Sequence, residues 1–144
     1  MLSRRNRLLF WAALLLLGGL AGCGDGSPPV VKVTGTLNYL GKPVTNAHLT
    51  FLPDFGRQSW AQTDAQGKFK INYDKHQDGA VVGKHKVWVE YKPISHAEQE
   101  AYMMGKPPPI SKEMKTFFEK YGQANSTLEV QIERNTRELN LNLD

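Results

Sequence analysis

The sequence has almost no cysteine and carries little net charge outside its N-terminus. Cys23 is the single cysteine in 144 residues, so no disulfide can form within the chain. The formal net charge is +4, but residues 1–22 hold three arginines and no acid, and the remainder has 15 basic against 14 acidic residues. A nucleic-acid binder needs a basic face in its folded part. The composition therefore argues against a nucleic-acid partner.

The N-terminal apolar run is short for a membrane-spanning helix. It extends from Leu8 to Leu20, and 13 helical residues rise only about 20 Å, against the roughly 30 Å of a hydrocarbon core. The run follows arginines and precedes the small residues Ala21 and Gly22. This pattern predicts that residues 1–22 are a secretory signal peptide.

The end of this segment resembles the lipobox of bacterial lipoproteins, at Leu20-Ala21-Gly22-Cys23. The resemblance implies cleavage between Gly22 and Cys23, with a diacylglyceryl group on the Cys23 thiol. It also implies attachment through this lipid to an inner or outer membrane of the bacterial cell envelope, facing the periplasm or the exterior. The alternatives for Cys23 are a free or intermolecular thiol and a catalytic thiol. Residues 23–29 are rich in Gly, Ser and Pro, which is typical of a flexible tether rather than of a catalytic pocket.

Residues 30–144 are predicted to form one β-rich domain, because apolar and polar residues alternate through much of this region. Turn signals separate the alternating segments, such as Asp64 and Gly67 at the first and fourth positions of a type I turn. The seven predicted strands cover residues 30–39, 47–52, 60–63, 69–73, 85–91, 128–132 and 139–143. We expect an all-β, seven-stranded antiparallel β-sandwich, with a β-barrel as the alternative.

The strand pattern is interrupted at residues 92–126, where we expect an insertion with short helices before the last two strands. Ser95 with Glu98 is a capping-box pattern, and Gly105 lies where that helix would end. A second helix is expected over residues 111–122, anchored to the sandwich by its aromatic side chains.

Three stretches together resemble a transthyretin-like domain of the carboxypeptidase-regulatory type. They are VTGTLNYLGKPVTNAHLTFLP, AQTDAQGKFKI and GAVVGKHKVWVEY, in that order. His85 stands where the family usually has an aromatic residue. The resemblance implies a Greek-key (prealbumin-like) sandwich and an accessory role in the envelope. It implies no catalytic residue, no metal and no cofactor.

An enzyme is the alternative, as a divergent metal-dependent enzyme on the same sandwich. Related dioxygenases hold iron partly through a close His-x-His pair, but here the four histidines are scattered. They are His48, His76, His85 and His96. No nucleophile elbow, phosphate loop or zinc-protease motif occurs in the sequence.

Two tryptophans make a candidate binding surface. If Val87 and Val89 face the core, Trp88 faces away from it, and Trp60 is expected to do the same. Exposed aromatic side chains on a sheet can stack on sugars or meet a protein. The alternative is that the 92–126 insertion covers them. The sequence therefore predicts a lipid-anchored, non-catalytic structural or binding module with an envelope protein or polysaccharide as partner.

Overall fold

The computed structural model describes residues 28–93, 95–106 and 110–144. The predicted signal peptide, its cleavage site and Cys23 lie outside these residues. No helix in the described part of the chain is long and apolar enough to cross a membrane.

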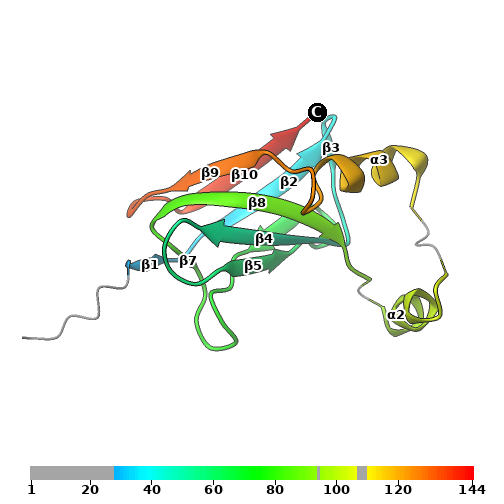
Figure 1. Cartoon of the computed structure of the whole chain (residues 1–144), viewed down its shortest axis with the longest axis horizontal. Coiled ribbons are helices and arrows are strands. Elements are labelled where there is room, and N and C mark those ends of the chain that lie inside the picture. Colours follow the sequence, from blue (N-terminus) through cyan, green and yellow to red (C-terminus); the bar gives the residue numbers. More distant parts are fainter. Residues whose placement is uncertain (1–27, 94, 107–109) are drawn as a thin grey trace, which may run out of the picture.

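Two four-stranded sheets pack face to face (Figure 1). The first contains β2 (Thr34–Tyr39), paired on one side with β10 (Glu138–Leu143) and on the other with β3 (Lys42–Pro43) and β6 (Lys68–Lys70). The second has the order β5 (Ser59–Gln62), β4 (Ala47–Pro53), β8 (Gly83–Tyr91) and β9 (Leu128–Ile132). A short ladder joins β1 (Val30–Val31) to β7 (Ala80–Val81). The β-sandwich is confirmed, and every predicted segment contains a strand. The described residues form ten strands rather than the predicted seven, because residues 30–39 contain both β1 and β2, and the two-residue strands β3 and β7 lie between predicted segments.

One strand pair corrects the purely antiparallel prediction. β2 and β10 are parallel, with Gly35 opposite Leu139 and Leu37 opposite Leu141. Hairpin-connected strands must run antiparallel, whereas these two are separated by most of the domain. Their direction is therefore not constrained by a turn, and alternation alone does not reveal it.

The core lies between the sheets and follows the predicted alternation. Leu37 of β2, Leu49 and Phe51 of β4, and Val87 and Val89 of β8 are fully buried. Burying such side chains is the main source of stability for a domain of this size.

His85 is a core residue in the position that the family resemblance assigned to an aromatic. It is fully buried, and its ring lies edge-on to Phe51 at a centroid distance of 6.4 Å. Its Nε2 lies 2.8 Å from the carbonyl oxygen of Val81. Because a carbonyl only accepts, Nε2 carries the proton and donates this bond. His85 therefore fills the space of an aromatic ring while making a hydrogen bond.

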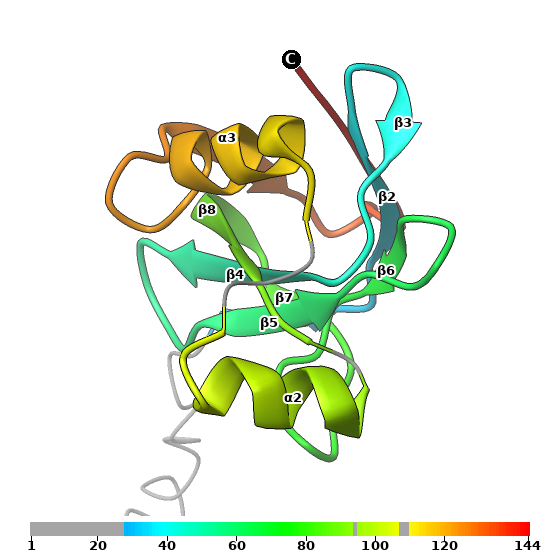
Figure 2. The same cartoon turned by 90° about the vertical axis from the view of Figure 1, so that its right-hand side faces the viewer.

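The insertion forms two helices at one end of the sandwich (Figure 2). Helix α2 (His96–Met103) has the predicted Ser95–Glu98 capping box, and none of its residues is buried. Helix α3 (Lys112–Lys120) is capped by Ser111 and buries Phe117 against Tyr39, at a centroid distance of 4.9 Å. The predicted aromatic anchoring of the second helix is confirmed.

Gly35 is required where β2, β10 and β6 meet. A Cβ atom at this position would lie 2.0 Å from the carbonyl oxygen of Leu139 and 2.6 Å from Cζ of Phe69. Real atoms do not approach so closely, so any side chain would push β10 or the Phe69 ring away.

We predict that Gly35→Ala lowers the free energy of unfolding by about 2 kcal/mol or more, because the added methyl overpacks a backbone contact. Urea denaturation would measure it. Thr34→Ala, one residue earlier on an exposed position of β2, is the control and should cost less than about 1 kcal/mol. Equal losses for the two variants would contradict the packing argument.

Candidate functional site

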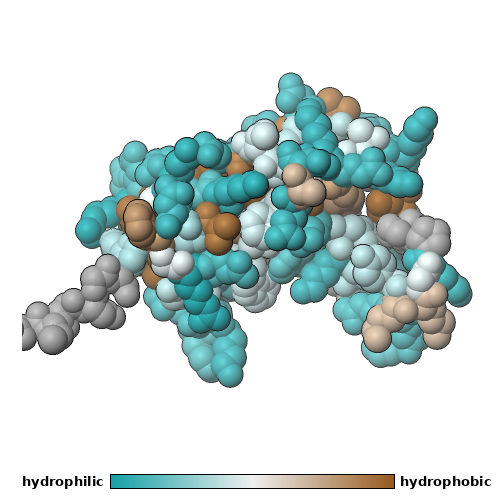
Figure 3. All heavy atoms as spheres, in the orientation of Figure 1, coloured by the Kyte–Doolittle hydropathy of each residue, from teal (hydrophilic) through white to brown (hydrophobic). Residues whose placement is uncertain are grey.

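The outer face of the second sheet gathers the polar and aromatic residues of β4, β5 and β8. The strand register places Thr50 of β4 between Trp60 of β5 and Trp88 of β8. In the next row, His48 lies between Gln62 and Glu90. Figure 3 shows the molecule from the side of this sheet, where most of the surface is hydrophilic and apolar groups are scattered.

Trp60 is the exposed aromatic of this face. Its side chain is 40% exposed, and its ring stacks on that of His48 with a centroid distance of 5.8 Å and an interplanar angle of 20°. Thr50, its neighbour on β4, is buried. The stacked pair holds the indole in a fixed position beside a small side chain.

Trp88 points to the same side but is only 8% exposed. The chain that leaves α3 runs along β8 at this point. The amide of Val89 donates to the carbonyl of Tyr121, and the hydroxyl of Ser126 donates to the carbonyl of Val87. Of the two tryptophans in the predicted surface, Trp60 alone offers a large exposed ring area to a ligand.

Two polar side chains beside Trp60, those of His48 and Gln62, face each other across the pairing of β4 with β5. Nδ1 of His48 and Nε2 of Gln62 are buried and have no hydrogen-bond partner among the described residues. Buried polar atoms are normally satisfied, because an unpaired one costs free energy. We define the Trp60 surface as Trp60, His48 and Gln62, with Thr50 beside Trp60 on the neighbouring strand. These two atoms are closed to solvent, so the part of this surface that a ligand reaches first is the exposed ring of Trp60, with the half-buried side chains of His48 and Gln62 beside it.

The charge state of His48 is set by its position on this face. Partial burial lowers the pKa of the imidazole, and the positive charge of Lys92 lowers it further. The Gln62 side chain and the Glu90 carboxylate act in the opposite direction and do not offset these effects. His48 is therefore neutral at neutral pH, with one ring nitrogen as a donor and the other as an acceptor.

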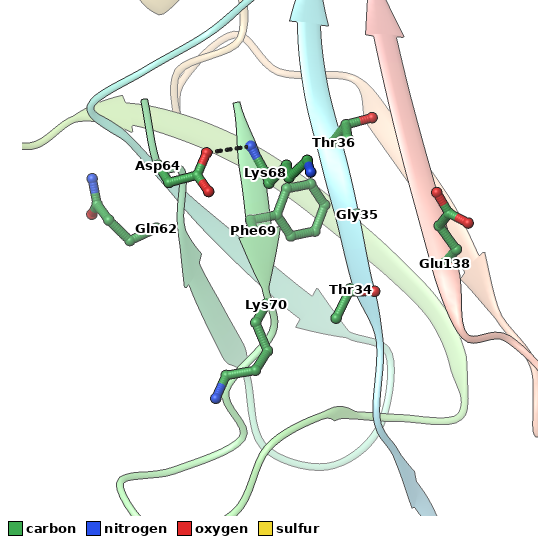
Figure 4. Close-up of a pocket in the computed structure, with 9 residues that line it drawn as sticks. All are labelled: Thr34, Gly35, Thr36, Gln62, Asp64, Lys68, Phe69, Lys70 and Glu138. Atoms are coloured by element: carbon green, nitrogen blue, oxygen red, sulfur yellow. Dashed lines mark hydrogen bonds between the residues drawn. The ribbon is translucent and has the colours of Figure 1, made fainter. Parts of the chain in front are cut away.

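A hollow of about 480 Å³ lies beside β2 and β6 (Figure 4). Its charged groups mostly have structural partners. Asp64 accepts hydrogen bonds from the amides of Gln66 and Lys68 and so closes the predicted turn, while Lys70 pairs with Asp78 at 3.1 Å. Gln62 lines one edge of this hollow, so the hollow adjoins the Trp60 surface.

The histidines do not converge on a metal site. His85 is in the core, His48 is on the sheet, and His96 is on α2, where it pairs with Glu100. Within the ranges that the structure describes, no three His, Cys, Asp or Glu side chains lie in an arrangement that could hold a metal ion.

The sequence did not identify His48 or Gln62 as members of a site. The alternation of apolar and polar residues places residues 48, 60 and 62 on outward positions of their strands, and the sequence carries no other signal for this site. Their proximity depends on the register of β4 against β5, and this register depends on the geometry of the connection between them.

No family model matches this sequence, and no curated protein or solved structure shows significant similarity to it.

We predict that His48 makes stability depend on pH in the mildly acidic range. Its pKa is lowered in the folded state, so on acidification the unfolded chain takes up this proton first. Stability should fall as the pH drops from about 7 to about 5, and His48→Gln should reduce this fall. Urea denaturation at a series of pH values measures it. Above about pH 7.5 the two stability curves should be parallel, since His48 is neutral in both states. An equal fall in stability on acidification in the wild type and in His48→Gln would contradict a role of His48 in the pH dependence.

Proposed function

We propose that this protein is a lipid-anchored component of the bacterial cell envelope whose β-sandwich is a non-catalytic binding module. The anchor is supported by Leu20-Ala21-Gly22-Cys23 at the end of a short apolar run with arginines before it. The binding role is supported by the Trp60 surface. Two or more acyl chains hold a protein stably on a bilayer.

We also infer a transthyretin-like, Greek-key arrangement for the sandwich. Its support is the order of the sequence motifs and the two four-stranded sheets into which they fold. The parallel β2–β10 pair is a feature that the strand pattern did not predict.

The single observation that carries the binding role is the exposed Trp60 ring, which stacks on His48 on the outer face of the second sheet. Sugar rings have apolar C–H faces that stack on aromatic side chains, and hydroxyl groups that need donors and acceptors. The exposed Trp60 ring offers a stacking surface for such a C–H face, and the half-buried polar side chains of His48 and Gln62 beside it can meet hydroxyl groups. We propose an envelope polysaccharide as the ligand.

We predict that Trp60→Ala weakens binding of the full chain to purified envelope polysaccharide by about tenfold or more, because a central aromatic contributes heavily to such contacts. Trp60→Phe should retain most of the binding. Calorimetric titration would give the dissociation constants. Tyr102→Ala, a similarly exposed aromatic on α2, is the control and should bind normally. Binding that is unchanged in Trp60→Ala, or recovery of a protein partner that needs Trp60, would contradict a polysaccharide site.

We predict that the mature protein begins at Cys23 and carries lipid on this residue. Mass spectrometry of the protein from bacterial membranes should find the N-terminal peptide starting at Cys23 with a diacylglyceryl mass. Cys23→Ser should stay uncleaved at this site and lack the added mass. An unmodified peptide that continues through Gly22 and Cys23 would rule out the anchor.

A further inference from the structure

The described N-terminus is fixed to one end of the sandwich. The carbonyl of Pro29 accepts a 2.8 Å hydrogen bond from the amide of Val82, and β1 pairs with β7 immediately afterwards. Pro28 lies beside Gly56, since a Cβ atom at Gly56 would be 3.7 Å from Cγ of Pro28. The chain therefore enters the domain next to the connection between β4 and β5, and Figure 1 shows both at the same end of the molecule.

That connection, residues 54–58, presents an apolar side chain to solvent. Phe55 is 82% exposed, although phenylalanine is among the residues most often buried. Pro28, Phe55 and Val82 line a hollow of about 250 Å³ at this end. Figure 3 shows apolar groups close to the N-terminal end of the described chain, on an otherwise hydrophilic face.

The distance from a lipid on Cys23 to this end is short. Cys23 precedes Pro28 by five residues, which span at most about 18 Å when fully extended. Because β1 holds Pro28 in place, the end that carries Phe55 is the end nearest to the anchored membrane. This step rests on the lipid anchor proposed above.

We propose that Phe55 and the 54–58 loop form a second membrane contact, in which Phe55 inserts into the interfacial region of the bilayer that carries the anchor. A single aromatic side chain binds a bilayer too weakly to hold a protein by itself. The lipid anchor compensates for this weak affinity, since it keeps Phe55 at a high effective concentration near the bilayer. Arg57 is exposed in the same loop and can contact anionic headgroups. Asp54, the acidic residue of this loop, reduces the electrostatic attraction to them.

This contact would fix the orientation of the domain. Residues 54–58 join β4 to β5, and these strands carry the Trp60 surface along the side of the sandwich. Helices α2 and α3 lie at the opposite end from β1 (Figure 1). With Phe55 in the bilayer, the helical end points away from the membrane and the Trp60 surface stays accessible from the side.

The test uses the lipidated full chain reconstituted into vesicles of phosphatidylethanolamine and phosphatidylglycerol that contain nitroxide-labelled lipid. Since acylation occupies the Cys23 thiol, Gln58→Cys provides a single reactive thiol on the exposed loop. A fluorophore attached to this thiol should be quenched by the nitroxide. The same fluorophore on Met103→Cys, which is 87% exposed on α2, should not. Adding Phe55→Ser to Gln58→Cys should restore the fluorescence.

Flotation of the same samples separates the two proposals. If the chain floats with the vesicles but position 58 is not quenched, or is quenched equally with Phe55→Ser, the Phe55 contact is wrong and the anchor stands. If the chain does not float at all, the anchor is wrong and the Phe55 contact falls with it. Quenching at position 58 that depends on Phe55, with none at position 103, supports the proposal.

Discussion

The pairing of β2 with β10 is the constraint on which the rest of the structure depends. It joins the first long strand of the domain to the last one, and the chain between them supplies all four strands of the facing sheet. Gly35 makes the pairing possible, because β10 and the Phe69 ring occupy the space of a side chain there. The side chains of β4 and β5 alternate between the core and the outer face of their sheet, because successive residues of a strand point to opposite faces. A long insertion between β8 and β9 can also be accommodated without disturbing the core.

The insertion is attached by aromatic packing, and the segment that follows its second helix borders β8. Phe117 of α3 contacts Tyr39 and Tyr121, and the Tyr121 hydroxyl donates to the carbonyl of Asp144 at the end of the chain. The segment after α3 is thereby held against β8, on either side of Trp88. Trp88, which lies between the two residues held in this way, is buried, while Trp60, two strands away on β5, is exposed.

Local features were predictable from the sequence, whereas pairings between distant segments were not. Period-two alternation located the strands, and the capping box located α2, because both depend only on neighbouring residues. The parallel direction of β10, the stacking of His48 on Trp60 and the burial of Trp88 each depend on segments far apart in the chain. The same alternation that correctly placed Trp88 on the outer side could not show that the 121–126 segment would lie beside it.

The two proposed contacts use different parts of the same pair of strands. The body of β4 and β5 carries His48, Trp60 and Gln62, and the loop that joins these strands carries Phe55. A membrane contact at the loop therefore leaves the strand faces free, and it also limits how the domain can rotate about its tether. A polysaccharide held by Trp60 would then lie beside the domain and close to the membrane, because the short segment from Cys23 to Pro28 leaves no room for the sandwich to move far from it. On this arrangement, the anchor decides both where the module is held and which ligands it can reach.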